Sequence, residues 1–231
     1  MCQVRFVRIL HIAFIIVALG SLSGCRKSGS APSAATPTSP NSSAASTPPT
    51  AADRRDDSSQ SVDPIVVLHT TQGDITLKLF VEKAPRTVEN FLRGYAERGF
   101  YDQTIFHHVE RGRMLIAGGY TPELAKKPTR APIYNESRNG LSNRRGTVAM
   151  IREPESPHSA TSEFFVNLTD NPEFDCKISD EDDVPGYCVF GEIVAGMDIV
   201  DRIAQLPTAS RGEFPKLPSP DVSIVTVQRL Q

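Results

Sequence analysis

The chain has 231 residues, of which 39% are hydrophobic and 23% are charged, an ordinary balance for a soluble protein. This length fits one domain or at most two small ones. The formal net charge is −2, so electrostatics gives no reason to expect nucleic acid as a partner. Composition alone therefore indicates a globular protein and leaves its chemistry open.

The first 24 residues are typical of an export signal. Arg5 and Arg8 form a short positive region, and an apolar run from 9 to 19 follows, interrupted only by His11. Spanning a bilayer takes about 20 apolar residues, so this run is too short to do so comfortably. It fits the apolar core of a secretory signal. We therefore expect residues 1–24 to be removed on export.

The signal ends in 22–25 (LSGC), which resembles the bacterial lipobox, a small-residue cleavage site before a cysteine. The resemblance implies that Cys25 is diacylated, and two acyl chains anchor a protein stably. Arg26 rather than Asp follows this cysteine, which by the same resemblance favours the outer membrane. An ordinary secretory signal with a chance cysteine is the alternative. We expect a lipid-anchored protein of the cell envelope, facing the periplasm or the exterior.

Residues 25–62 are expected to form the lipidated cysteine and a tether. From 31 to 52 every residue except Asn41 is Ala, Ser, Thr or Pro. Such a composition cannot form a hydrophobic core, so we expect this segment to be disordered.

Residues 63–231 are expected to form one folded domain. Residues 65–80 contain two β-rich runs around a turn at Gly73-Asp74. Pro85 is well placed to open a helix, whose apolar face comprises Val88, Phe91, Leu92 and Tyr95. A second helix is predicted over 197–205, with Pro207 ending it.

Further short strands are predicted by runs of β-forming residues. They lie at 104–109, 114–116, 147–151, 164–168, 187–194 and 222–227. Many short strands together with two helices favour a mainly β fold, a closed antiparallel barrel.

Five stretches resemble the cyclophilin family of peptidyl-prolyl isomerases, in the family's order. They are 84–91 (APRTVENF), 101–107 (YDQTIFH), 140–150 (GLSNRRGTVAM), 159–165 (SATSEFF) and 189–197 (VFGEIVAGM). The resemblance implies a closed eight-stranded antiparallel barrel capped by two α-helices. It also implies a surface groove that holds an X-Pro bond, with no cofactor or metal. The expected partners are Pro-containing segments of exported proteins, bound by a monomer.

The resemblance directs attention to rotation about the prolyl amide, whose barrier is about 18–20 kcal/mol. Conjugation is lost at the top of this barrier, and the proline nitrogen gains a lone pair. A catalyst therefore needs a donor aimed at the twisted amide and an apolar floor for the proline ring. In the family an arginine is the donor. Assisting slow folding outside the cytoplasm is the role that this implies.

The family's groove residues carry over unevenly. Its Phe-His-Arg appears as 106–108 (FHH), so His108 replaces the arginine. Its Gly-Phe-Met appears as 112–114 (GRM), so Arg113 replaces a phenylalanine. Phe165 keeps the deep proline-pocket position, and we assign catalysis to these three residues. The resemblance implies substrate-binding positions at Met114, Ile116, Ile151, Glu163, Glu173, Phe174 and Tyr187.

Two hypotheses concern the missing arginine. Arg113 supplies a guanidinium from another wall of the groove, with Glu163 as its partner, or the two form a solvated pair of no catalytic use. Alternatively His108 is the donor, and the rate rises as pH falls through its pKa, ordinarily about 6.5. An exposed histidine without a role is the alternative for His108.

The cysteines of the domain form an even pair. Cys176 and Cys188 would lie in an oxidising compartment, so we predict a disulfide between them. Two separate buried thiols are the alternative. The acidic run 180–183 between them lacks an EF-hand spacing, so we interpret it as a solvated loop rather than a metal site.

Two functions of different class remain. The first is an anchored peptidyl-prolyl isomerase with reduced activity. The second is a cyclophilin scaffold that binds Pro-containing segments or an envelope partner with little turnover. The motifs favour the first, and the replaced groove residues favour the second.

Overall fold

The computed structural model describes residues 62–177 and 184–230. The predicted signal, Cys25, all but the last residue of the predicted tether and the acidic run 180–183 lie outside the described residues. No helix within the described ranges has the length and apolar character needed to cross a membrane.

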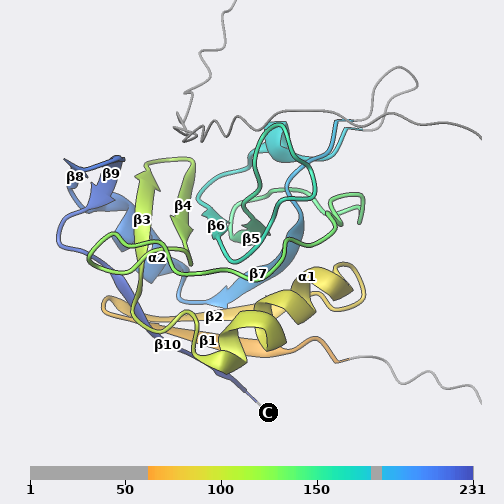
Figure 1. Cartoon of the computed structure of the whole chain (residues 1–231), viewed down its shortest axis with the longest axis horizontal. Helices are drawn as coiled ribbons and strands as arrows, with labels where there is room; N and C mark the ends of the chain where they lie inside the picture. The colour runs from red at the N-terminus through yellow and green to blue at the C-terminus, as the bar shows by residue number, and fades with distance from the viewer. Residues whose placement is uncertain (1–61, 178–183, 231) are drawn as a thin grey trace, which may run out of the picture. The chain divides into compact units, whose positions relative to one another are not determined.

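Eight of the described strands close into a barrel, in the order β1-β10-β3-β4-β6-β5-β7-β2 (Figure 1). All neighbouring pairs are antiparallel. Together with helices α1 and α2, this confirms the expected architecture. The strands are β1 (Ile65–Thr70), β2 (Gly73–Leu79), β3 (Thr104–Glu110), β4 (Met114–Ala117), β5 (Thr147–Met150), β6 (Phe164–Asn167), β7 (Val189–Ala195) and β10 (Ser223–Arg229).

The first hairpin follows from alternation of apolar and polar residues. Ile75, Leu77 and Leu79 of β2 are fully buried, as expected for a strand with one face on the core. The turn lies two residues earlier than predicted, at 71–72. Gly73 opens β2 with a φ of +127°, a conformation that glycine adopts without strain.

Helix α1 (Pro85–Glu89) continues into a π-helical segment (Asn90–Tyr95) and a 3₁₀ turn (Ala96–Arg98). Its first free amides are satisfied by a distant carboxylate: Glu136 accepts the backbone N–H of Thr87 at 2.8 Å and that of Arg86 at 3.2 Å. The predicted apolar face is confirmed, since all four of its members are at least 96% buried: Val88, Phe91, Leu92 and Tyr95.

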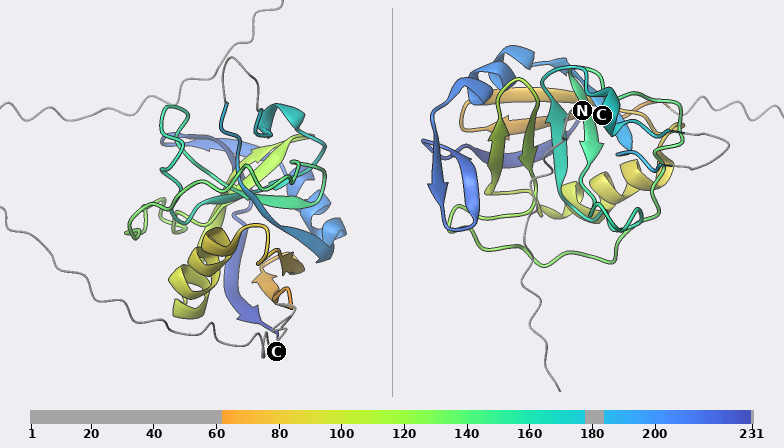
Figure 2. Two further views of the ribbon diagram at one scale, coloured as in Figure 1. Left: turned by 90° about the vertical axis from the view of Figure 1, so that its right-hand side faces the viewer. Right: turned by 90° about the horizontal axis from the view of Figure 1, so that it is seen from above.

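Helix α2 (Met197–Gln205) has the bounds that the sequence predicted. It buries Val200, Ile203 and Ala204. Arg111 donates to the carbonyls of Gln205 at 3.1 Å and Leu206 at 3.0 Å, which satisfies acceptors left free at the helix end. The two helices lie on different sides of the barrel (Figure 2).

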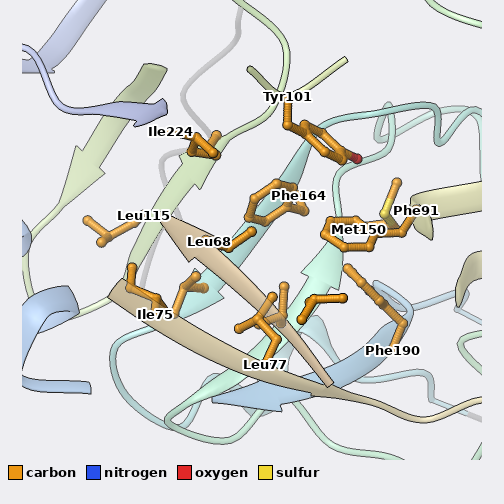
Figure 3. Close-up of a cluster of buried hydrophobic side chains, with 14 of the residues drawn as sticks. Leu68, Ile75, Leu77, Phe91, Tyr101, Leu115, Met150, Phe164, Phe190 and Ile224 are labelled. Carbon is orange, nitrogen blue, oxygen red and sulfur yellow. The ribbon is translucent and has the colours of Figure 1, made fainter. Parts of the chain in front are cut away.

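The hydrophobic core fills the barrel and extends to α1 and its continuation. Phe91 meets Phe164 of β6 nearly edge to face, with ring centroids 5.7 Å apart, and Tyr101 at 5.1 Å. Side chains of β1, β2, β4, β5 and β7 surround them (Figure 3). Aromatic pairs of this kind contribute about 0.5–1.5 kcal/mol beyond their area burial.

A hairpin that the sequence patterns did not predict, β8 (Thr208–Arg211) with β9 (Phe214–Pro218), packs beside the barrel. Phe214 and Leu217 are 8% and 2% exposed and form a small second cluster with Ile105 of β3. All four β8 residues are exposed, and β9 contains Pro215 and Pro218. Neither strand therefore shows clean alternation.

Candidate active site

One row of side chains crosses five neighbouring strands on the outer face of the barrel. His108 of β3 is paired with Ile116 of β4, and Ile116 with Phe165 of β6. Phe165 is paired with Ala149 of β5, and Ala149 with Val189 of β7. Residues directly opposite in antiparallel strands share a face, and alternate residues of these strands form the core. Strand register thus brings three predicted site residues side by side.

Phe165 is the floor of an aromatic cluster outside the barrel interior. It is 1% exposed. Its ring lies 5.5 Å from Phe174 and 5.5 Å from Tyr187, both steeply inclined to it. Tyr187 donates its backbone N–H to the carbonyl of Phe174 at 2.8 Å, which joins the two segments that carry these rings. We call the following set the Phe165 cluster: Phe80, Met114, Ile116, Leu141, Ala149, Ile151, Phe165, Phe174, Tyr187 and Val189.

His108 lies at one edge of the Phe165 cluster and is half-buried. Burial lowers its pKa below 6.5; Lys216 and His107 lower the pKa further, and Glu110 opposes them. Its ring is therefore neutral at pH 7 and offers a single N–H donor. Among the described residues, no side-chain or backbone group forms a hydrogen bond with it.

Arg113 does not pair with Glu163, so that prediction is wrong. Its guanidinium lies 4.8 Å from the ring centroid of Phe174 and 3.1 Å from a carboxylate oxygen of Glu173. A second carboxylate, Glu110, lies 3.8 Å away. Arg113 is a residue of the tight β3–β4 turn, which holds it over η3 (Pro172–Phe174) at the rim of the cluster. The Glu173 side chain is 50% exposed and therefore lies at the rim of the cluster.

Glu163 instead forms the centre of a separate ionic group. Its oxygens lie 3.4 Å from His107 Nε2 and 3.4 Å from Lys126 Nζ, and its side chain is 16% exposed. Burial alone would raise its pKa, but the hydrogen bond from His107 and the charge of Lys126 outweigh burial and lower the pKa. Gly119 leaves room for this side chain, because a Cβ there would lie 2.6 Å from Glu163 Cγ.

A family model described as cyclophilin type peptidyl-prolyl cis-trans isomerase/CLD matches residues 65–229, which is most of the chain. The chain belongs to the cyclophilin family. Peptidyl-prolyl cis-trans isomerase B of Escherichia coli (strain K12) is 47% identical over 163 residues, covering 71% of this chain and 98% of the relative. A peptidyl-prolyl cis-trans isomerase of Acinetobacter baylyi is 42% identical over 164 residues, covering 71% and 84%.

A solved structure supports the fold assignment. The cyclophilin type isomerase of Cryptosporidium parvum, determined in the presence of the dipeptide Ala-Pro, matches with a TM-score of 0.61. Its sequence is 23% identical, and the match covers 72% of this chain and 99% of that one. At this identity the likeness shows the barrel fold alone.

Sequence reasoning missed three residues at the Phe165 cluster. Leu141, Phe80 and Arg152 were not selected, although Leu141 and Phe80 pack against it. The Arg152 guanidinium lies 4.8 Å from the Tyr187 ring centroid and donates to the carbonyls of Gly186, Glu153, Pro154 and Pro185. Its position next to predicted Ile151 was the available signal. Through these contacts Arg152 links the segment that carries Tyr187 to the loop after β5.

The cyclophilin domain does not contain the predicted disulfide, because Cys176 and Cys188 are free thiols in the structure. Cys188 points toward the interior, where its Sγ lies 3.5 Å from Thr87 Oγ1 and 3.9 Å from Asn139 Nδ2. Burial raises the pKa of Cys188 to about 11. Tyr187, its neighbour in sequence, faces the Phe165 cluster instead, as alternation requires.

Within the described ranges, His, Cys, Asp and Glu do not gather in groups of three or more that could hold a metal ion. The arrangement present consists of an apolar, aromatic floor, one unengaged imidazole and two guanidinium groups at the rim.

Proposed function

We propose that this chain isomerises X-Pro bonds in exported proteins, bound on the Phe165 cluster, at a rate below that of family members with arginine at the position of His108. The observation that carries this proposal is the row His108–Ile116–Phe165 across three strands. It places a free hydrogen-bond donor beside a buried aromatic floor, and these are the two groups that amide rotation requires.

The floor accounts for proline binding. Phe165, Phe174 and Tyr187 form three mutually inclined faces, and a proline ring seated on them removes apolar surface from water at about 25 cal/mol per Å². When the proline ring is held in place, the preceding residue rotates about the prolyl C–N bond against a fixed nitrogen. The barrier then depends on how well the protein stabilises the twisted nitrogen.

The donor accounts for the expected low rate. A neutral imidazole donates one hydrogen bond, whereas a guanidinium has five donors and a permanent charge. Removing a positioned donor to a developing charge costs on the order of 10²–10³ in rate. We therefore place this chain between an arginine-bearing enzyme and a scaffold without a donor.

Arg113 is the rival donor. Its guanidinium is already engaged by Glu173, Glu110 and the Phe174 ring, which supports a rim role. We expect Arg113→Ala to retain most of the activity. Arg93→Ala is a matched surface control, because among the described residues the Arg93 guanidinium forms its ion pair with Glu89 alone, at 3.9 Å. Abolition by Arg113→Ala alone would make Arg113 the donor.

Envelope location and lipid anchoring rest on the sequence at the start of the chain. The apolar run 9–19 and the LSGC motif ending at Cys25 support them. Expression in a bacterium with a radiolabelled fatty acid tests this proposal. Label is expected in the wild type and absent from Cys25→Ala, and a wild-type chain without label would contradict the anchor.

Proline exchange by NMR tests the isomerase proposal. The full chain in detergent is added to a short Ala-Pro peptide, and cis/trans exchange is compared with the uncatalysed process, which takes tens of seconds or longer. We expect faster exchange with wild type, faster still with His108→Arg, and none above background with Phe165→Ala. Circular dichroism of each variant confirms that it folds.

A binding module without turnover is the second candidate. The engagement of the Arg113 guanidinium by two carboxylates favours it, because this permanently charged donor is then not free for a bound peptide. Peptide-induced shifts of the Met114 and Ile116 methyl groups without exchange, in both wild type and His108→Arg, would establish binding alone.

A further inference from the structure

We infer that a buried network of asparagine side chains positions one wall of the Phe165 cluster, and that Asn171 and Asp175 are positioning residues for proline binding. This inference rests on the proposed function, since it takes the cluster as the seat of the proline ring. The wall is η3, which carries Phe174; that ring lies 5.5 Å from Phe165 and 5.2 Å from Tyr187. Asn171 immediately precedes η3 and Asp175 immediately follows it, so the contacts that hold these two residues also hold the wall.

The network begins on the strand that carries the floor. Asn167 lies two residues after Phe165 on β6, so its side chain shares the outer face of the barrel with the floor ring. It is nevertheless fully buried. Its Nδ2 donates to Asn143 Oδ1 at 3.2 Å and to Thr147 Oγ1 at 2.9 Å. Its Oδ1 accepts from Asn171 Nδ2 at 2.7 Å, which ties the start of η3 to the floor strand.

Asn143 holds η3 at both ends. Its backbone N–H and its Nδ2 both donate to Asp175 Oδ1, at 2.6 Å and 2.9 Å. Its carbonyl accepts the backbone N–H of Asn171 at 2.8 Å. Asn143 and Asn171 are each 2% exposed. Leu141, a member of the Phe165 cluster, lies two residues earlier in the same loop, so these bonds fix two parts of the cluster relative to each other.

The network also reaches the β3–β4 turn. Asn171 Nδ2 donates to the carbonyl of Arg113 at 3.1 Å, and the backbone N–H of Leu168 donates to the same carbonyl at 2.9 Å. In the part of the chain that the structure describes, no side-chain nitrogen or oxygen of the three asparagines is buried without a hydrogen-bond partner. A buried polar network in which every member is satisfied rigidifies the segments it joins and specifies one arrangement of them. The turn that carries Arg113 and the wall that carries Phe174 therefore belong to one rigid unit.

Gly186 fixes the wall from the side of Tyr187. A Cβ at Gly186 would lie 2.6 Å from the carbonyl oxygen of Phe174, well inside the roughly 3.5–4.0 Å of ordinary contact. Gly186→Ala therefore displaces the wall through packing alone and leaves the asparagine network intact.

The wall acts on binding and not on the rotation step. The proline ring stays seated while the preceding residue rotates, so the wall contacts it equally in the ground state and in the transition state. Weakening a uniform contact of this kind raises KM and leaves kcat unchanged. Removal of the proposed donor at His108 instead lowers kcat. One kinetic assay therefore separates the two roles.

The test is exchange of the Ala-Pro peptide by the full chain in detergent. We expect Asn171→Ala, Asp175→Ala and Gly186→Ala each to raise KM about tenfold, with kcat within about twofold of wild type. Asp175→Asn keeps the oxygen to which Asn143 donates and should restore KM to near the wild-type value. A role limited to the charge of Asp175 would not be rescued in this way and would overturn the inference.

Asn90→Ala is the matched control. Asn90 is 9% exposed, and its Nδ2 donates to the carbonyl of Thr161 at 2.7 Å, so the variant loses a buried asparagine contact away from the wall. Its free energy of unfolding should fall like that of Asn171→Ala, while its KM stays at the wild-type value. An equal rise of KM in Asn90→Ala would show a general effect of lost stability and would contradict positioning by the network.

Methyl NMR without added peptide reads the position of the wall directly. Met114 and Ile151 pack against the Phe165 cluster; their methyl shifts should change in Asp175→Ala and return in Asp175→Asn, while those of buried Ile75 should not change. Unchanged shifts together with an unchanged KM in Asn171→Ala and Asp175→Ala would overturn the inference. A wild type that binds the peptide without exchange would refute isomerisation alone, and dissociation constants would then be compared in place of KM. A wild type that neither exchanges nor binds would overturn both.

Discussion

The pH dependence of His108 gives the sharpest test of the donor assignment. Its pKa lies below 6.5 because the ring is half-buried, and because Lys216 of β9 and His107 of β3 oppose its charge more than Glu110 of β3 supports it. A hydrogen bond from a neutral donor contributes about 0.5–1.5 kcal/mol, and one from a charged donor about 1.5–3 kcal/mol. If His108 is the donor, its protonation therefore strengthens the transition-state contact by roughly 1–1.5 kcal/mol, or about tenfold in rate.

The assay is kcat/KM for Ala-Pro exchange across the acid range. We expect a flat profile above pH 6.5 and a rise below it that levels off beneath the pKa of His108. His108→Gln keeps a neutral donor and should remove the rise, and His108→Arg should be fast and flat. A wild-type rise that survives in His108→Gln would refute the assignment and transfer the titration to another group.

Stability must be followed in the same range, because the same pKa acts on folding. A histidine whose pKa is lowered in the folded state favours the folded state when neutral. That contribution is present above pH 6.5 and is lost as pH falls through the lowered pKa. Chemical unfolding at each pH separates a loss of folded protein from a gain in rate.

Three further predictions concern the groups around the cluster. Glu163→Gln should destabilise the protein by about 2 kcal/mol at pH 7. The destabilisation should be much smaller at low pH, because the carboxylate's contribution is present above the ordinary pKa of 4.5 and is lost as pH falls through the lowered pKa of Glu163. An equal loss at both pH values would contradict the ionic role. Phe214→Ala should lower the free energy of unfolding by about 3 kcal/mol. It should also release Lys216 and so raise the pKa of His108, measured by NMR titration; an unchanged pKa would show that the β8–β9 hairpin does not influence the site. Thiol titration of the denatured, unreduced domain should find both Cys176 and Cys188, with Cys188 unreactive before denaturation because its thiol is buried; finding neither would restore the predicted disulfide.

Sequence reasoning succeeded where a local period determines the structure. The helical period gave the buried face of α1 and its π-helical continuation, and period and Pro207 together gave the bounds of α2. Two-residue alternation gave the buried face of β2. It failed where a contact joins distant segments. We predicted that Arg113 pairs with Glu163 because both occupy groove positions. The β3–β4 turn instead holds Arg113 against Glu173, and Lys126 from a separate loop pairs with Glu163. Register and loop geometry decide such contacts.

The cysteine prediction failed for a reason that was present in the sequence. Tyr187 was assigned to the groove, and neighbouring residues in an extended segment face opposite sides. Cys188 should therefore have been expected to face the interior, away from the segment that carries Cys176. Spacing alone said how many residues a disulfide would enclose, but not where the two side chains point. The β8–β9 hairpin offered less signal, since its burial depends on Phe214 and Leu217 alone in an exposed segment.

The strand register also explains how a cyclophilin barrel can keep its core while the residues on its outer face differ. Along β3, β4 and β6, residues that face the core alternate with residues of the outer row. The core residues are Val109, Leu115 and Val166. Their neighbours in the outer row are His108, Ile116 and Phe165.

Changing an interior residue leaves a cavity or a clash costing several kcal/mol, whereas changing a half-exposed outer residue costs far less. The stability of this barrel therefore places little constraint on whether position 108 holds a histidine or an arginine. The donor at the edge of the Phe165 cluster can change from a charged to a neutral group while the floor and the fold stay as they are. Under the proposed function, the scaffold therefore determines whether a proline binds, and we expect residue 108 to set the rate of isomerisation.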